Sequence, residues 1–200
     1  MKIKSFETEK YINTLVPFKN PLLIYGSDEG LVEHRTNKII NTFLKGDKQN
    51  ALTTFDNKGS NQINFEDIIC TKSLFSNKEV IKVTGGNDKI IEKLNSKLIN
   101  NESLLVIINA GELLPRSKLR KLFENENNMG VIACYKIDSL ELKKIIIDYI
   151  NKHKLKINNE ALIYLTENLG QNYQIIINEL NKLLLIKEET INFENIKNLI

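Results

Sequence analysis

The sequence contains few of the side chains that bind metals or cross-link a fold. It has only two cysteines and two histidines among 200 residues. Cys70 and Cys134 stand 64 positions apart in apolar stretches, a spacing that fits neither a metal-ligand motif nor a disulfide framework. His34 and His153 have no ligand-like neighbour at helical spacing. We therefore expect reduced, buried cysteines, surface histidines and no metal site.

Long hydrophobic runs are also missing. No run approaches the roughly 20 apolar residues that cross a bilayer. The N-terminal stretch MKIKSFETEKYINTL is charged throughout and has no signal-peptide core. We therefore expect a cytoplasmic protein without membrane segments. Hydrophobic residues make up 42% of the chain and charged residues 26%, which is typical of an ordinary globular protein with one large or two small domains.

A strong charge of either sign is absent as well. The net charge is +3, and residues 1–138 carry all of the excess, with 20 basic and 17 acidic residues against eight of each in residues 139–200. An excess this small does not by itself argue for nucleic-acid binding.

What the first part of the chain does contain is a strand–helix alternation. Several of its short runs are continuously apolar, which is typical of parallel strands buried on both faces. The expected strands are 22–25, 52–55, 79–83, 104–108 and 130–134. The expected helices are 28–44, 64–70, 87–99 and 115–126, with Asp28 as a cap of the first and Pro115 in the first turn of the last. This order predicts a doubly wound α/β domain over residues 1–138.

After Asp138 only helices are expected, at 139–152, 158–168, 172–187 and 193–200. Asp138 or Ser139 can cap the first of them. The third carries an apolar stripe at Ile176, Leu180, Leu183 and Leu184, which we interpret as core packing. Residues 139–200 are therefore expected to form a small helical domain.

The stretch LLIYGSDEGLVEHRT, residues 22–36, has the layout of a phosphate-binding loop, with a strand, a glycine turn and a helix start. Such a loop needs G-x-x-x-x-G-K-[ST]. Counting from Gly26, the second glycine position is Leu31 and the lysine position is Val32. Asp28, Glu29 and Glu33 would moreover repel a nucleotide triphosphate.

Two further elements of a nucleotide hydrolase are also missing. The acidic residue expected after the apolar strand LLVII is replaced by the neutral Asn109. In the stretch GQNYQIIINEL, the position of a phosphate-sensing arginine reads Gln174. These three losses predict an ATPase fold without the chemistry, with no catalytic residue and no cofactor.

The chain resembles the delta subunit of the bacterial DNA polymerase III clamp loader. The resemblance rests on five collinear stretches, LLIYGSDEGLVEHR, KSLFSNKEVIKVTG, LLPRSKLRKLFE, LKINNEALIYLTENLGQNYQIIINELNKLLL and INFENIKNLI. It implies an AAA+ module, made of an α/β domain and a helical lid, and the family's third domain, the collar, is absent from these 200 residues. The holoenzyme it implies is a DNA-directed DNA polymerase, a nucleotidyltransferase, in DNA replication.

The resemblance also implies a function and partners. The family's delta subunit does not hydrolyse ATP but opens the ring-shaped sliding clamp, the beta subunit. Its other partners are the gamma/tau and delta prime subunits of the loader, with DNA contacted indirectly or weakly. A Leu-Phe pair enters a hydrophobic pocket on the clamp, and the matching residues here are Leu74 and Phe75, preceded by Ser73. Thr71 departs from the family's glutamine-like position.

The residues alone favour another interpretation, in which Leu74 and Phe75 are core side chains that precede the strand at Glu79, and only the resemblance favours clamp binding. The basic residues Arg116, Lys118, Arg120 and Lys121 are candidates for facing DNA. Their alternative is a solvated helix face, with Leu119, Leu122 and Phe123 on its buried side.

Two other functions stay open at this point. The strand–glycine–helix layout is compatible with a degenerate but active nucleotide hydrolase. The helical part is compatible with a protein-binding adaptor.

Overall fold

The computed structural model describes residues 2–3, 5–13, 20–45, 50–57, 78–94, 103–197 and 199. The chain divides into two compact units, Met1–Tyr135 and Lys136–Ile200. This division falls three residues before the expected boundary at residue 138. The helix expected at 64–70 lies outside the described residues.

The first unit is built on a parallel sheet of six strands in the order β1-β6-β2-β5-β4-β3. The strands are β1 (Lys2–Ile3), β2 (Leu22–Tyr25), β3 (Asn50–Asp56), β4 (Lys78–Thr84), β5 (Leu104–Ala110) and β6 (Gly130–Ala133). β2 lies at the centre, where Leu22 is in register with Ile107 of β5 and with Gly130 of β6. All residues of β2 and β5 are buried, as their continuous apolar runs predict.

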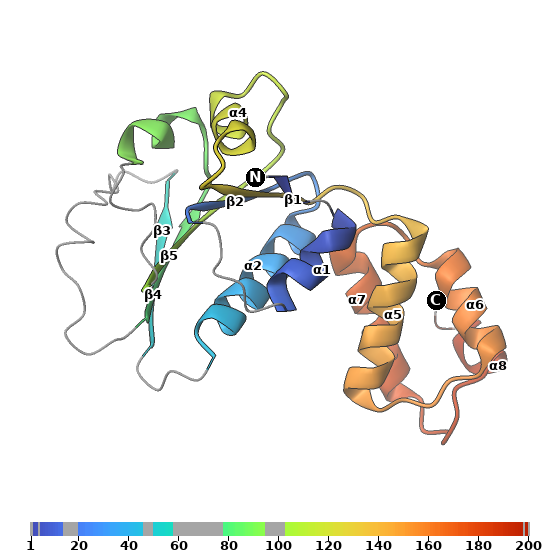
Figure 1. The fold of residues 1–200 in the computed structure, drawn as a ribbon. Coiled ribbons are helices and arrows are strands. Elements are labelled where there is room, and N and C mark those ends of the chain that lie inside the picture. Colours follow the sequence, from blue (N-terminus) through green and yellow to red (C-terminus); the bar gives the residue numbers. More distant parts are fainter. Residues whose placement is uncertain are drawn as a thin grey trace. The chain divides into compact units, whose positions relative to one another are not determined.

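Helices cover both faces of this sheet (Figure 1). They are α1 (Ser5–Asn13), α2 (Glu29–Phe43), the 3₁₀ helix η1 (Asp88–Lys93) and α4 (Lys118–Asn125). α1 and α2 lie on one face, and α4 and η1 lie on the other. The central strands β2 and β5 therefore need apolar side chains on both sides, which is why their sequences hardly alternate with polar residues. The edge strand β3 is largely exposed and carries polar residues.

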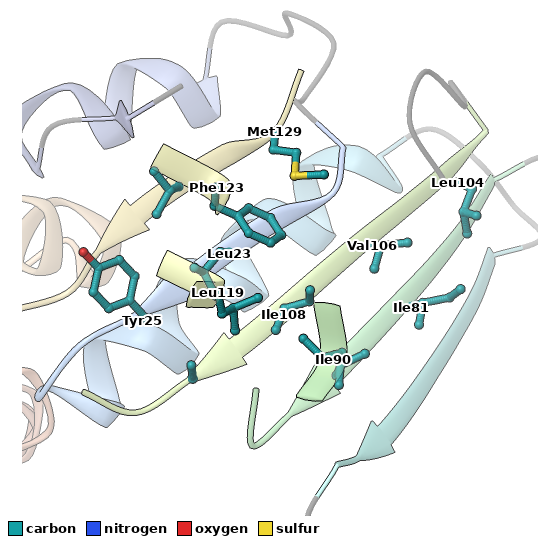
Figure 2. Packing of buried hydrophobic residues seen from close by; sticks show 13 residues of the cluster. Leu23, Tyr25, Ile81, Ile90, Leu104, Val106, Ile108, Leu119, Phe123 and Met129 are labelled. Carbon is teal, nitrogen blue, oxygen red and sulfur yellow. The ribbon is translucent and has the colours of Figure 1, made fainter. Parts of the chain in front are cut away.

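The core between the sheet and the pair α4–η1 follows from the two-residue period of a strand. Leu23 and Tyr25 of β2 point to this face together with Val106 and Ile108 of β5 (Figure 2). Side chains alternate along a strand, so their sequence neighbours belong to the other face. Phe123 of α4 and Ile90 of η1 pack against them. Burial of each such large side chain contributes about 1.5–3 kcal/mol.

Several elements differ from the expectation. β1 and α1 were not expected, because two strand residues and a mostly charged helix give little periodic signal. The helix expected at 87–99 is a 3₁₀ helix over Asp88–Lys93, and residues 95–102 lie outside the described part. The helix expected from Pro115 begins only at Lys118, because Ser117 caps it and Pro115 lies in the preceding turn.

The second unit is helical. Its helices are α5 (Ser139–His153), α6 (Asn159–Asn168), α7 (Tyr173–Lys182), the 3₁₀ helix η3 (Leu183–Leu185) and α8 (Phe193–Ile196). Asp138 caps α5, as predicted, by accepting a hydrogen bond from the Glu141 N–H at 2.9 Å. Between Ile157 and Ile191 the chain forms an isolated parallel bridge.

The expected helix 172–187 ends earlier as an α-helix, because α7 tightens into η3 at Leu183. Ile176, Leu180 and Leu183 are fully buried, as expected of core residues. Leu184 was also expected in the core but is exposed, because the tighter turn rotates it away from the stripe. Within the described residues, no helix has the length and apolar character needed to cross a bilayer.

Candidate functional site

The loop between β2 and α2 lies at the carboxyl edge of the sheet, where open α/β sheets bind ligands. A phosphate-binding loop presents free backbone N–H groups there. In this loop two of these groups already have partners within the protein. The Gly26 N–H donates to the Gly111 carbonyl at 3.2 Å, and the Asp28 N–H donates to the Cys134 carbonyl at 3.2 Å. The loop is thereby tied to the ends of β5 and β6.

Gly26 makes this close approach possible. Its φ is +154°, and a Cβ atom added to it would lie 1.8 Å from the Cys134 carbonyl oxygen. Real Cβ atoms do not approach backbone at that distance, so no other residue fits here without movement of β6.

Asp28 occupies the place of an anion at the N-terminus of α2. It is only 3% exposed, and its Oδ1 accepts a hydrogen bond from the Leu31 N–H at 2.9 Å. A helix N-terminus favours negative charge, and here the protein's own carboxylate supplies it. This confirms the expected cap and gives a reason for the missing phosphate ligands.

Replacement of Asp28 by alanine is expected to lower the free energy of unfolding by about 1 kcal/mol, the usual effect of losing an N-cap. Urea denaturation followed by circular dichroism measures this change. Asp28→Ser is the matched control and should retain most of the stability, because a serine hydroxyl can also accept the Leu31 bond. Equal losses in both variants would contradict the capping role.

The two positions that a phosphate-binding loop reserves for glycine and lysine are core positions here. Leu31 is 2% exposed and Val32 is 6% exposed. Both side chains therefore point into the first unit's interior, away from the space that a nucleotide would occupy.

The end of β5 carries an amide in place of a carboxylate. Asn109 is buried, and its Oδ1 lies 2.8 Å from the Thr36 hydroxyl on α2. The same hydroxyl lies 2.8 Å from the Val32 carbonyl oxygen, to which it donates. The Thr36 hydroxyl thus faces two acceptors, the Asn109 amide oxygen and the Val32 carbonyl, and shares its single proton between them. The pair links α2 to β5 as a neutral contact.

The remaining position of the hydrolase pattern lies in the second unit. Gln174, on α7, is exposed and donates from Nε2 to Asn178 Oδ1 at 3.1 Å. Among the described residues, no three histidine, cysteine, aspartate or glutamate side chains gather as metal ligands.

The N-terminus of α4 is bound directly by Asp88 of η1, which lies about thirty residues earlier in the sequence. The Asp88 carboxylate accepts hydrogen bonds from the Ser117 hydroxyl at 2.8 Å, the Leu119 N–H at 2.9 Å and the Lys118 N–H at 3.2 Å. These bonds hold the pKa of Asp88 below its usual value. The bond from the Leu119 N–H has the largest effect on this pKa, and the bond from the Ser117 hydroxyl has the second largest. The basic first turn of α4 is thus fixed to η1.

The four basic residues of this region do not behave alike. Arg116, Lys118 and Lys121 are exposed. The side chain of Arg120 is only 15% exposed and is held by protein partners. Its guanidinium lies 5.4 Å from the centre of the Tyr25 ring, and it donates to Glu124 Oε1 at 3.1 Å.

Comparison with protein families shows to which family the chain belongs. Residues 22–135 match the family "DNA polymerase III, delta subunit". This match covers more than half of the chain and contains both the β2–α2 loop and α4. The chain belongs to the DNA polymerase III delta subunit family.

Individual relatives agree with this membership. A Rickettsia prowazekii protein named "Probable DNA polymerase III subunit delta" is 26% identical over 163 residues, which are 82% of this chain and 49% of that protein. The chain therefore spans about half the length of the curated relative that it matches.

Solved structures show the same AAA+ fold. The Bacillus subtilis DNA clamp loader delta protein matches with a TM-score of 0.56 and 16% identity over 98% of this chain and 62% of that one. The Thermotoga maritima RuvB Holliday junction branch migration motor matches with a TM-score of 0.59 and 15% identity over 98% of this chain and 68% of that one. At such identities the likeness speaks for the fold alone.

In this delta-family chain, the expected clamp-binding residues Ser73, Leu74 and Phe75 lie outside the described residues. The described chain resumes at Lys78, the first residue of β4. Its ammonium donates to the carbonyl of Phe43, the last residue of α2, at 2.8 Å and lies 5.2 Å from the centre of the Phe43 ring. A cation at a helix C-terminus is favourable, so the start of β4 is anchored to α2.

Two residues with structural roles in this region had not been singled out from the sequence. Arg35 is 2% exposed and donates from Nη1 to the Ala133 carbonyl at 3.0 Å, next to the Cys134 carbonyl that holds the loop. The burial of Arg35 could have been predicted from helical spacing, because Arg35 stands four residues after Leu31 on the same face of α2. The role of Asp88 could not have been predicted from local spacing, because its hydrogen-bond partners are about thirty positions away in the sequence.

The Asp88 contacts predict a pH-dependent contribution to stability. Because the folded pKa lies below the unfolded one, the stabilisation is present above the ordinary aspartate pKa and is lost as pH falls through the lowered value. The urea midpoint of Asp88→Asn should therefore lie below that of the unmodified chain at neutral pH, and the gap should close in acid, once the pH has fallen below the lowered pKa of Asp88. Asp148→Asn, at an exposed position of α5, should show no gap at either pH. A gap that persists in acid would contradict the assignment.

Proposed function

We propose that this chain is the clamp-binding part of a clamp-loader delta subunit, which binds and opens the sliding clamp for loading onto DNA and does not hydrolyse nucleotide. The observation that carries the proposal is the family match over residues 22–135, which spans the position of the Leu74–Phe75 pair. The proposed site of action is the cytoplasm.

The β2–α2 loop supports the non-catalytic part of the proposal. The Gly26 and Asp28 N–H groups are satisfied by carbonyls, the N-terminus of α2 is capped by a carboxylate, and Val32 is buried at the lysine position.

The proposed partners are the beta sliding clamp and the gamma/tau and delta prime subunits of the loader. DNA is a weaker, indirect partner, for which Arg116, Lys118 and Lys121 are the available cations, because they are exposed. Arg120 is committed to Tyr25 and Glu124 and would reach DNA only by giving up those contacts.

Surface plasmon resonance with the immobilised cognate clamp tests the central claim. The chain is expected to bind saturably. Absence of binding at any reachable concentration would remove clamp binding from this part of the protein.

The competing hydrolase function predicts the opposite result in a nucleotide titration. Isothermal titration with magnesium and ATP is expected to give no binding heat, because a nucleotide would have to displace the Asp28 carboxylate from α2. Steady-state phosphate release should stay at the level of buffer. Tight binding or measurable turnover would restore the hydrolase and defeat the non-catalytic proposal.

The adaptor alternative places the partner site in the helical unit. It predicts that residues 139–200 suffice for binding of a protein partner. The proposed function predicts that they do not suffice, because the expected clamp-binding pair Leu74 and Phe75 belongs to the first unit.

A further inference from the structure

Helix α5 carries large apolar residues on two sides, and only one of these sides is buried within the second unit. Leu142, Ile146, Tyr149 and Ile150 are buried in the second unit. Tyr149 also donates its hydroxyl proton to Asn181 Oδ1 at 2.7 Å, which links α5 to α7. This face accounts for the packing of α5 within the unit.

The opposite face of α5 carries a second apolar stripe. At 100° per residue, Leu140, Lys144, Ile147 and Asn151 point away from the buried side. Leu140 is 82% exposed and Ile147 is 37% exposed. A single exposed leucine is ordinary, but two large aliphatic side chains seven residues apart, outside the buried face, form a stripe that the unit's own packing does not use.

Positive charge flanks this stripe. Lys143 and Lys144 are exposed and have no carboxylate partner among the described residues. Asp148 lies at the edge of the stripe. Residues 136–156 contain six lysines and three acidic residues, whereas residues 157–200 contain three lysines and six acidic residues. The positive charge of the second unit is therefore concentrated on the segment that bears the stripe.

We propose that the outward face of α5, formed by Leu140, Lys143, Lys144 and Ile147, docks an acidic amphipathic helix of a protein partner. The two aliphatic residues match the apolar stripe of such a helix, and the lysines match its flanking carboxylates. This inference concerns the second unit and does not depend on clamp binding by Leu74 and Phe75.

Other occupants fit these observations less well. Nucleic acid would cover Leu140 and Ile147 with phosphates and gain nothing from them. A membrane-binding helix needs a broad apolar face, and the broad face of α5 is already buried. The first unit does not supply an acidic partner surface overall, because it carries a net charge of +3, with 19 basic and 16 acidic residues over 1–135. In a symmetric dimer, the lysines of this face would oppose those of a second copy.

The test uses the full chain and a fluorescent peptide of about 18 residues, or five helical turns, with leucines on one stripe and glutamates elsewhere. Fluorescence anisotropy should show saturable binding of this peptide. A scrambled isomer without the stripe, and a version with lysines in place of glutamates, should not bind. The double variant Leu140→Ser, Ile147→Ser should bind at least ~10-fold more weakly.

A charge exchange gives the sharpest readout. The double variant Lys143→Glu, Lys144→Glu should lose the glutamate peptide and gain the lysine peptide. Leu185→Ser is the matched control, because Leu185 is 74% exposed in the same unit but lies on η3. All variants change exposed side chains, and circular dichroism should show unchanged melting.

Several results would overturn the proposal. They are failure of the glutamate peptide to bind, an equal loss in Leu185→Ser, and charge-exchange variants that do not gain the lysine peptide. Dimerisation in analytical ultracentrifugation that Ile147→Ser abolishes would make a second copy the occupant. Binding of a DNA duplex or of anionic lipid vesicles that depends on Leu140 and Ile147 would assign the face to those partners instead.

Discussion

Simultaneous replacement of Leu74 and Phe75 by alanine is expected to weaken binding to the cognate sliding clamp by at least ~100-fold. Burial of a leucine or phenylalanine side chain in a pocket contributes about 1.5–3 kcal/mol each, so the loss of both amounts to about 3 kcal/mol or more. Apolar anchors of this kind carry most of the energy of many interfaces. The effect should appear mainly in the dissociation rate measured by surface plasmon resonance.

The control for this prediction is Leu114→Ala. Leu114 is 51% exposed in the same unit, just before α4, so it tests whether any exposed leucine matters. Melting curves of both variants should coincide with that of the unmodified chain. Undiminished clamp binding by the double variant would remove the pair from the interface. A lower melting temperature together with lost binding would instead indicate that the two side chains belong to the core.

Gly26→Ala is expected to lower the free energy of unfolding by at least about 3 kcal/mol. A φ of +154° is a conformation that side-chain-bearing residues avoid, and the strain alone amounts to about 1–3 kcal/mol. The added methyl group would also lie 1.8 Å from the Cys134 carbonyl oxygen, which belongs to the chain leaving β6 and cannot rotate away as a side chain would. Urea denaturation of the variant measures the loss.

Gly111→Ala is the matched control at the same edge of the sheet. A Cβ atom added to Gly111 would have no heavy atom of another part of the chain within 4 Å, so the stability should change little. Similar losses in the two variants would show that the close approach of Gly26 to Cys134 does not govern stability. Survival of Gly26→Ala with an unchanged midpoint would have the same meaning.

Much of the first unit's sheet could be predicted from the sequence, because its strands are buried on both faces. A short, continuously apolar run such as LLIY is typical of a buried parallel strand, and the expected range 22–25 coincides with β2. Helix ends were less predictable, because their caps come from distant residues. α4 starts at Lys118 and not at Pro115, since Ser117 and the remote Asp88 both bind its first N–H groups.

The same distinction holds for the candidate site. The absence of lysine at Val32, of a carboxylate at Asn109 and of an arginine at Gln174 could be read from local spacing. The internal hydrogen bonds of the loop could not be predicted in this way, because the Gly26–Gly111 bond joins residues 85 positions apart. The role of Ser73, Leu74 and Phe75 remains a prediction from family resemblance, and these residues lie outside the described chain.

The internal contacts of the β2–α2 loop have a consequence for its redesign. A lysine at position 32 would place a cation where a 6% exposed valine packs, and an uncharged residue at position 28 would leave the α2 N–H groups uncapped. Each of these single changes lowers stability before any phosphate contact is gained. Several substitutions would therefore have to be made together before this loop could hold a phosphate.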